Sequence, residues 1–212
     1  YKVAYLLMQG LKPWSILALT FTNKAANEMK ERINKIVGGN EARHIYMGTF
    51  HSIFSRILRV EAEKIGYTSN FTIYDDADSK SLIKAIVKDM DLNDKVYKPS
   101  VVASRISMAK NHLVLPDGYA YDSSFQKRDV ETHMLDMTKL YAAYCDRCRR
   151  ANAMDFDDLL VNTYVLFNEH PEVLKKYASN FQYILVDEYQ DTNAVQQKIV
   201  CQLASVNNRV CA

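Results

Sequence analysis

The residues best suited to chemistry lie near the end of the chain, where an apolar run stops at two adjacent carboxylates. Asp187 and Glu188 directly follow the run Tyr-Ile-Leu-Val at 183–186. A buried parallel strand has this composition, and open α/β sheets bind ligands at the carboxyl ends of such strands. There Asp187 can hold Mg²⁺, and Glu188 can orient or deprotonate a water that attacks a phosphoryl group. The alternative is a turn that only caps the next helix, but Gln190 and Asp191 extend the polar run and favour the chemical interpretation.

An aromatic residue and two small polar residues follow another apolar run, at 15–20. These residues are Phe21, Thr22 and Asn23, and they precede a segment with helical spacing of apolar residues. Thr22 or Asn23 can cap that helix, and the free amides of a helix start can also hold a phosphate oxygen. Phe21 can stack a base of a single-stranded nucleic acid, an interaction worth about 1–3 kcal/mol. It can equally be a core residue, and spacing alone does not decide between the two.

The same arrangement recurs after the apolar stretch at 44–49. Thr49 ends that stretch, and Phe50 and His51 open the next helical pattern. Thr49 and His51 can contact phosphate in the same way, or they can simply cap the helix.

Length and composition fit one large globular domain, or one domain with an insertion. The chain has 212 residues, of which 48% are hydrophobic and 25% charged, and its formal net charge is +2. So small a net charge gives no global basic signature, so any contact with nucleic acid must come from a local surface. The sequence contains no secretory signal and no apolar run of membrane length, so no membrane partner is expected.

The cysteines give little support to a metal or redox site. Cys145 and Cys148 form a Cys-x-x-Cys pair, but Cys201 and Cys211 do not supply a second pair with ligand spacing. Since positions i and i+3 share a helix face, we expect the first pair to be core or boundary residues. A reduced cytoplasmic setting fits this pattern best.

Apolar patterns along the chain predict alternating strands and helices, and therefore a parallel sheet covered by helices on both faces. The expected strands are 15–20, 44–49, 183–186 and one that opens at Arg209, and residues 71–74 read as a short extended piece. The expected helices are 3–9, one from Ala25 that Gly38 and Gly39 stop, one from Phe50, one after Asp155, one from Pro171, and one over 195–203.

Between 78 and 152 the sequence gives no strand signal and predicts an inserted helical subdomain. We expect helices near 82–90 and 101–110, a loop at 113–124, and one long helix through 130–148. Several basic residues of this segment can touch a phosphate backbone or simply be solvated: Lys110, His112, Arg147, Arg149 and Arg150. Asp155, Asp157 and Asp158 follow the segment, and helix capping is expected of them before a metal site.

Four stretches, in one order along the chain, together resemble the superfamily 1 DNA helicases of the UvrD/PcrA/Rep family. The Asp-Glu-x-Gln-Asp run at 187–191 resembles the acidic motif of this family. Residues 17–29 resemble its motif Ia, 48–52 its motif Ib, and 154–160 its acidic segment after the helical insertion. The resemblance covers essentially the whole chain.

The resemblance implies a RecA-like α/β fold with an inserted all-helical subdomain. Residues 1–77 and 153–212 would form most of the first motor domain, and residues 78–152 the insertion. The parent protein would be an ATP-dependent DNA helicase of DNA repair or replication, using ATP and Mg²⁺, translocating 3′ to 5′ on single-stranded DNA and unwinding duplex. Its expected partners are single-stranded DNA, the single-strand/duplex junction, and a second RecA-like domain of the same parent chain.

The resemblance also implies roles for individual residues. Asp187 would hold Mg²⁺, Glu188 would be the catalytic base or orient the water, and Gln190 would sense the phosphate state. Asp191 would bond neighbouring loops. The DNA track would be lined by the residues of motifs Ia and Ib: Phe21, Thr22, Asn23, Thr49 and His51.

One part of the family's machinery is absent from the sequence. No Gly-x-x-x-x-Gly-Lys-[Ser/Thr] occurs, and the chain has only six glycines. The family places this P-loop just before the helix that here opens at Tyr1, so we expect both ends to be cuts through a longer protein. We therefore expect this chain alone not to hydrolyse ATP usefully. Two alternatives stay open: a subunit of a helicase–nuclease, and a non-catalytic DNA-binding scaffold that lost its P-loop.

Overall fold

The computed structural model describes residues 1–37 and 41–211, and the side chains of Glu41 and Ala42 are not described. The expected helix stop at Gly38 and Gly39 lies outside the described residues. The chain forms two compact units, each presented by itself. The first unit consists of Tyr1–Glu61 and Asn162–Ala212, and the second of Ala62–Val161.

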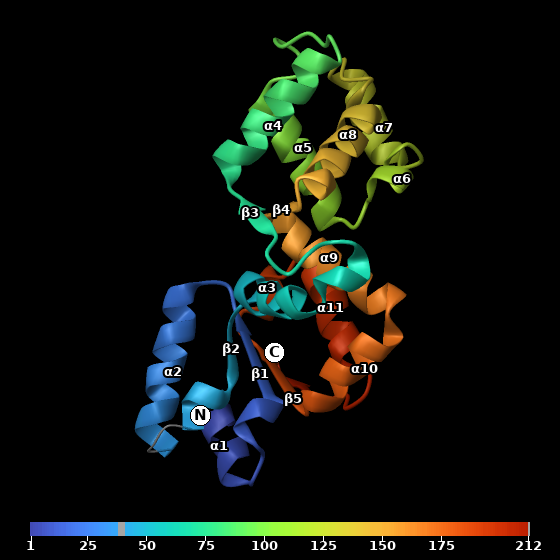
Figure 1. Ribbon diagram of the computed structural model, residues 1–212. Coiled ribbons are helices and arrows are strands. Elements are labelled where there is room, and N and C mark those ends of the chain that lie inside the picture. Colours follow the sequence, from blue (N-terminus) through green and yellow to red (C-terminus); the bar gives the residue numbers. More distant parts are fainter. Residues whose placement is uncertain (38–40, 212) are drawn as a thin grey trace. The chain divides into compact units, whose positions relative to one another are not determined.

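The first unit is built on a parallel sheet of four strands in the order β2-β1-β5-β6 (Figure 1). Its strands are β1 (Ile16–Thr20), β2 (Tyr46–Thr49), β5 (Tyr183–Val186) and β6 (Val210–Cys211). Its helices are α1 (Lys2–Met8), α2 (Asn23–Val37), α3 (Phe50–Glu61), α10 (Pro171–Asn180) and α11 (Ala194–Ala204), with 3-10 turns η1 (Pro13–Ser15), η2 (Glu41–His44) and η4 (Tyr189–Asp191).

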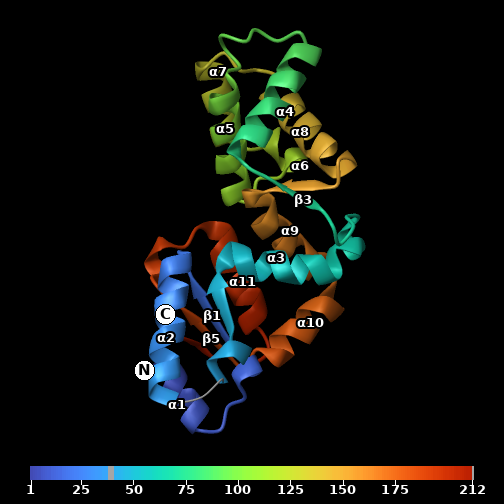
Figure 2. The ribbon, with the colours of Figure 1, turned by 60° about the vertical axis from the view of Figure 1, so that its left-hand side comes forward.

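Helices cover both faces of this sheet, which confirms the predicted α/β architecture. α1 and α2 lie on one side, and α10 and α11 lie on the other (Figures 1 and 2). On the first side Leu6, Ile16 and Ile33 belong to one apolar cluster, which joins the two helices to β1. Every residue of β1 is buried, as a central parallel strand requires because both of its faces are covered.

The second unit combines a two-stranded parallel sheet with a group of helices. β3 (Thr72–Tyr74) pairs with β4 (Ala153–Asp155), with Thr72 opposite Ala153 and Tyr74 opposite Asp155. The helices are α4 (Asp76–Asp89), α5 (Pro99–Asn111), α6 (Pro116–Tyr119), α7 (Ser123–Glu131) and α8 (Met137–Arg150), after the 3-10 turn η3 (Ala62–Ile65). The boundary between the two units falls within α9 (Phe156–Glu169).

Three expectations for this part of the chain were wrong or incomplete. The single helix expected through 130–148 is two helices, α7 and α8, because the backbone turns left-handed at His133, with φ of 56°. The expected loop at 113–124 contains the short helix α6, which Pro116 opens. β4 has only three residues and gave no recognisable pattern of its own.

Among the described residues, no helix is both long enough and apolar enough to cross a bilayer.

Candidate functional site

The two carboxylates after β5 lie on a turn that begins at the edge of the sheet. The amide of Asp187 donates to the carbonyl of Leu19 at 2.9 Å, so the pairing of β5 with β1 extends to the first acid. Glu188 then has φ of 53° and ψ of 48°, the left-handed conformation that residues with a Cβ seldom adopt. Non-glycine residues are held in this conformation when surrounding contacts enforce it, and such residues concentrate at functional sites.

The side chains of the acidic turn differ in their contacts. The side-chain amide of Gln190 donates to the carboxylate of Glu188. The carboxylate of Asp187 is exposed, and no other described side chain bonds to it. Asp191 is exposed too, and its carboxylate makes no hydrogen bond within the described part of the chain, so the bonds expected from Asp191 to neighbouring loops are not found there.

The start of α2 lies beside the acidic turn because β1 is the neighbour of β5. Phe21 follows β1 directly, and its side chain is 37% exposed at the edge of the sheet. Its ring packs against Phe50, with 5.7 Å between the ring centroids. Phe21 is therefore partly packed and partly open to a ligand. It combines features of both interpretations of its sequence position, a core residue and a base-stacking residue.

The start of α3 lies on the far side of the same strand, since Thr49 ends β2 opposite Thr20 of β1. The hydroxyls of Thr22 and Thr49 both cap helices, accepting from the amides of Ala25 at 3.1 Å and Ser52 at 3.2 Å. The Asn23 side chain is exposed, and His51 is half-buried in the first turn of α3. The capping predicted for the two threonines is thus present.

Three loops consequently meet the same edge of one sheet. The carboxyl ends of β2, β1 and β5 are neighbours in this order, and they carry Thr49, Phe21 and Asp187 respectively. This edge is where parallel α/β sheets bind ligands. It pairs an acidic turn with two helix starts, an arrangement that can serve phosphoryl chemistry beside a bound polyanion.

The acidic turn also fits a magnesium ion. Mg²⁺ is commonly held by one or two protein carboxylates together with substrate phosphates and several waters, and Asp187 supplies an exposed carboxylate of this kind. No group of three or more His, Cys, Asp or Glu side chains within the described ranges could hold a metal by itself. Further ligands would therefore have to come from water or a nucleotide.

The acids after the helical segment form a buried ion cluster that sequence reasoning did not find. Lys110 of α5 lies 2.6 Å from Asp155 and 2.7 Å from Asp158, and the Lys110 side chain is only 1% exposed. Asp155 and Asp158 also cap α9 reciprocally, each accepting from the backbone amide of the other. Capping was predicted, but the link to a lysine 45 residues earlier was not visible in local spacing.

The pKa values of this cluster follow from burial and from the opposed charges. Burial raises the pKa of Asp158 to about 6, although Lys110 lies beside it. Burial acts in the same direction on Asp155, but the charge and hydrogen bond of Lys110 outweigh it, and the pKa of Asp155 is lowered. Burial would lower the pKa of Lys110, but the two carboxylates raise it well above the usual value. Lys110 is thus charged and unavailable to DNA.

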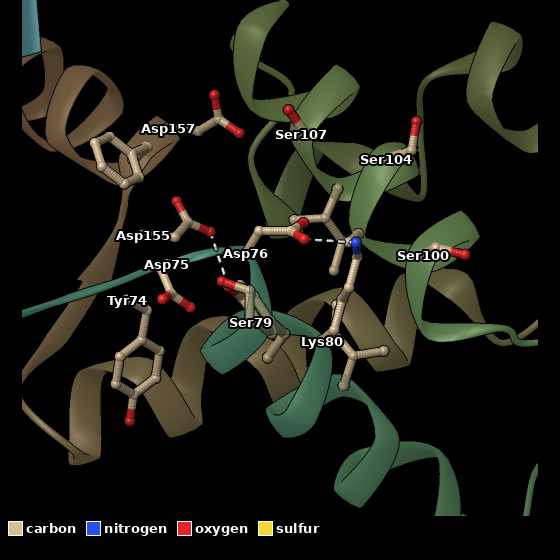
Figure 3. A pocket seen from close by; sticks show the side chains of 15 residues that line it. Tyr74, Asp75, Asp76, Ser79, Lys80, Ser100, Ser104, Ser107, Asp155 and Asp157 are labelled. Atoms are coloured by element: carbon tan, nitrogen blue, oxygen red, sulfur yellow. Dashed lines mark hydrogen bonds and ion pairs between the residues drawn. The ribbon is translucent and has the colours of Figure 1, made fainter.

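A pocket of about 340 Å³ in the second unit lies next to this cluster (Figure 3). Ser100, Ser104 and Ser107 of α5 line one part of it, and Asp155 and Asp157 line another. Its acids have partners within the protein: Asp76 pairs with Lys80, Asp155 with Lys110, and Asp157 accepts from Asn111.

The other basic and cysteine candidates also have contacts of their own. Arg147 pairs with Asp89 at 2.6 Å, Arg150 pairs with Asp146, and Arg149 donates to the carbonyl of Ile65. Cys145 is half-buried and Cys148 buried, both are free thiols, and burial raises the pKa of each to about 12. This confirms the interpretation of the pair as core or boundary residues.

A parallel sheet with helices on both faces and an acidic turn at its carboxyl edge defines an α/β domain of the RecA-like class, as the resemblance implied. A family model described as the UvrD/REP helicase N-terminal domain matches residues 1–212. The chain belongs to this family.

Curated relatives agree with this assignment. The chain is 44% identical over 212 residues to the "ATP-dependent DNA helicase PcrA" of Staphylococcus aureus strain NCTC 8325. It is 43% identical over 212 residues to the protein of the same name from Staphylococcus epidermidis strain ATCC 12228. Each comparison covers 100% of this chain and 28% of the relative, so the chain spans little more than a quarter of the curated relatives that it matches.

Proposed function

We propose that this chain is part of the first motor domain of an ATP-dependent DNA helicase, which translocates 3′ to 5′ on single-stranded DNA and unwinds duplex in DNA repair or replication. One observation carries the proposal: the acidic turn after β5 and the helix starts after β1 and β2 share one edge of the sheet. ATP hydrolysis at the acidic turn can therefore be coupled to a DNA strand that is held at the neighbouring helix starts.

The acidic turn would carry the chemistry. Asp187 holds Mg²⁺, which when bound neutralises charge on the transferred phosphoryl group. Glu188 accepts the proton of the attacking water or orients that water. Gln190 reports the state of the phosphate through its bond to Glu188, a contact present between the two side chains.

The neighbouring helix starts would hold the DNA. Phe21 stacks a base on the exposed part of its ring, which also packs against Phe50. Thr22, Asn23, Thr49 and His51 contact phosphates from the first turns of α2 and α3. The two capping threonines can do so with the helix amides around them.

The remaining machinery would come from other parts of a longer protein. Since the sequence has no P-loop, the lysine and amides that cradle the β- and γ-phosphates lie outside it, as does a second RecA-like domain. In this proposal residues 1–77 and 153–212 form the motor part, and 78–152 the helical insertion that works at the single-strand/duplex junction. The protein acts in the cytoplasm, and this chain alone hydrolyses ATP no faster than its Glu188→Gln variant.

The test is ATP hydrolysis by the full-length protein with and without single-stranded DNA, beside Glu188→Gln. Expected is DNA-stimulated hydrolysis whose kcat falls at least a hundredfold in the variant, while DNA binding persists. Gln182→Leu, a change at an exposed residue just before β5, is the matched control and keeps the full rate. Absence of hydrolysis in the wild-type protein, with DNA binding intact, would support the scaffold alternative instead. DNA cleavage in the presence of Mg²⁺ would indicate the helicase–nuclease alternative.

A further inference from the structure

The left-handed backbone at Glu188 requires contacts that hold the acidic turn. Asp187 is fixed by the bond of its backbone amide to β1, but the Glu188 side chain is exposed. The residues after it must therefore keep the turn closed. The amide of Asp191 donates to the carbonyl of Glu188 at 2.9 Å, which closes the first part of η4.

Thr192 closes the second part of the turn. Its amide and its hydroxyl both donate to the carbonyl of Tyr189, at 3.1 Å and 2.6 Å. Thr192 is 9% exposed, whereas Asp187, Glu188, Gln190 and Asp191 are all exposed. It is the point at which the solvated turn enters the packed part of the unit.

Gln197 in turn ties Thr192 to α11. The side-chain amide of Gln197 donates to the hydroxyl of Thr192 at 3.1 Å and to the backbone carbonyl of Thr192 at 3.3 Å. Asn193 and Gln196 form a reciprocal capping box at the start of this helix. α11 is anchored by fully buried residues such as Ile199 and Leu203, so the tie is made to a rigid element.

We propose that Thr192 is a positioning residue for Glu188, and that Gln197 acts through Thr192. The proposal rests on the proposed ATP hydrolysis. Without the Thr192 hydroxyl, Glu188 is free to leave the left-handed conformation, which is unfavourable for a residue with a Cβ. Its carboxylate then no longer meets the attacking water at a reactive distance and angle. Asp187 keeps its place because the strand, not the turn, fixes it.

This division between the two acids predicts a specific kinetic signature. Thr192→Val keeps the shape of the side chain and removes both of its hydroxyl bonds. We expect kcat to fall about tenfold, the factor that one lost hydrogen bond of ordinary strength produces. KM for ATP and the affinity for single-stranded DNA should change less than about twofold, because the changed group acts only on the reacting geometry.

Three further variants of the full-length protein complete the kinetic experiment. Thr192→Ser restores the hydroxyl and should recover most of kcat. Gln197→Leu removes the donor at an exposed position, so it tests the tie without a buried change, and kcat should fall about threefold. The double variant Thr192→Val with Gln197→Leu should be no slower than Thr192→Val alone, within about twofold, because both changes break one connection. Gln182→Leu serves as the unchanged control.

Hydrogen exchange gives a readout that needs no nucleotide. The amides of Asp191 and Thr192 both donate within η4, so Thr192→Val should speed their exchange about tenfold. Exchange at the amide of Asp187 should stay slow.

The outcomes separate this inference from the proposed function. If the wild-type protein hydrolyses ATP and Glu188→Gln does not, but Thr192→Val retains kcat, the positioning role is wrong while the proposed function stands. Equal losses in Thr192→Val and Thr192→Ser, or additive losses in the double variant, would also overturn it. If the wild-type protein does not hydrolyse ATP, the proposed function is wrong. Unchanged hydrogen exchange at the Asp191 amide in Thr192→Val would then also show that the Thr192 hydroxyl does not hold the acidic turn.

Discussion

Lys110 and Glu188 illustrate two opposite ways in which this protein holds a charged side chain. Lys110 is buried and neutralised by two carboxylates, whereas Glu188 is solvated and held through its backbone. Burying an ion is costly unless a partner lies close to it, so the Lys110 cluster stabilises one packing arrangement of α5 against α9. Glu188 is exposed and forms no ion pair with another described residue, so it can meet a ligand without first losing such a partner.

The shared site of Asp155 and Asp158 predicts opposite pH dependences for the two acids. The pKa of Asp158 in the folded state, about 6, lies above its unfolded value, so Asp158 favours folding below pH about 4 and this contribution is lost as pH rises through 6. The pKa of Asp155 is lowered, so its contribution is present at neutral pH and is lost as pH falls.

Isosteric amide variants test this difference in sign. From pH 4 to pH 7.5, the free energy of unfolding of Asp158→Asn should rise relative to wild type by up to about 3 kcal/mol, because the amide cannot ionise. The contribution of Asp155 changes only below its unfolded pKa of about 4, so between pH 4 and pH 3 the free energy of unfolding should fall less in Asp155→Asn than in wild type. Urea unfolding at pH 3, 4 and 7.5 measures both differences. A free energy of unfolding of Asp158→Asn that does not rise relative to wild type between pH 4 and pH 7.5 would contradict the assignment.

At the scale of elements, the break between α7 and α8 is a backbone feature with a measurable cost. His133 is exposed and left-handed, directly after the Thr132 cap of α7. Glycine adopts this conformation without the steric cost that a Cβ brings, and it is the usual residue after a helix end.

We therefore expect His133→Gly to be more stable than His133→Ala by about 1 kcal/mol. The alanine variant is the matched control, because it removes the same imidazole and keeps the Cβ. Chemical unfolding of both variants provides the comparison. If alanine were equal or better, the left-handed turn between the helices would be wrong.

Elements with a strong local pattern were predictable from the sequence, and those defined by distant partners were not. The apolar runs of β1 and β5 and the periodic face of α2 gave their positions directly. The break at His133 was missed because apolar residues at 130, 134 and 137 continue the helical spacing across it. β4 is a strand only because it pairs with β3, about 80 residues earlier in the chain.

The same limit applies to the candidate site. The sequence predicted which residues end strands and open helices, since those positions depend on local pattern. It did not predict the order β2-β1-β5, which brings the loops that carry Thr49, Phe21 and Asp187 to neighbouring positions. The roles of these residues in hydrolysis and DNA binding stay predictions until the variants are measured.

At the scale of the whole molecule, charge is divided unevenly between the two units. The first unit carries 13 Lys and Arg against 9 Asp and Glu, a net charge of +4, and the second carries 14 against 16, a net charge of −2. The near-neutral total therefore conceals a basic unit, the one that contains the proposed DNA-binding edge. A polyanion is attracted to local charge of this kind.

This asymmetry predicts where the salt dependence of DNA binding originates. Lys24 is exposed in the first turn of α2, beside Asn23, so Lys24→Gln should weaken binding of a single-stranded oligonucleotide. The slope of log K against log salt concentration should become shallower by about 0.7, the value of one phosphate contact. Lys84→Gln, at an exposed lysine of α4 in the second unit, should leave the slope unchanged. Fluorescence anisotropy titrations between 50 and about 200 mM salt measure both. A shallower slope in Lys84→Gln alone would assign the contact to the second unit.

The pairing of β3 with β4 has a consequence for how this protein can change over evolution. Parallel neighbours cannot be joined by a tight hairpin and require a long crossover, and here the whole of α4 to α8 is that crossover. Its entry and exit are fixed by three residue pairs, and Lys110 of α5 ties the segment to Asp155 at the end of β4. Helices that leave this ion pair in place can be added or exchanged in the segment without altering the strand register. The segment between β3 and β4 is thus a site at which related proteins can gain a new helical module while the sheet that carries the acidic turn stays unchanged.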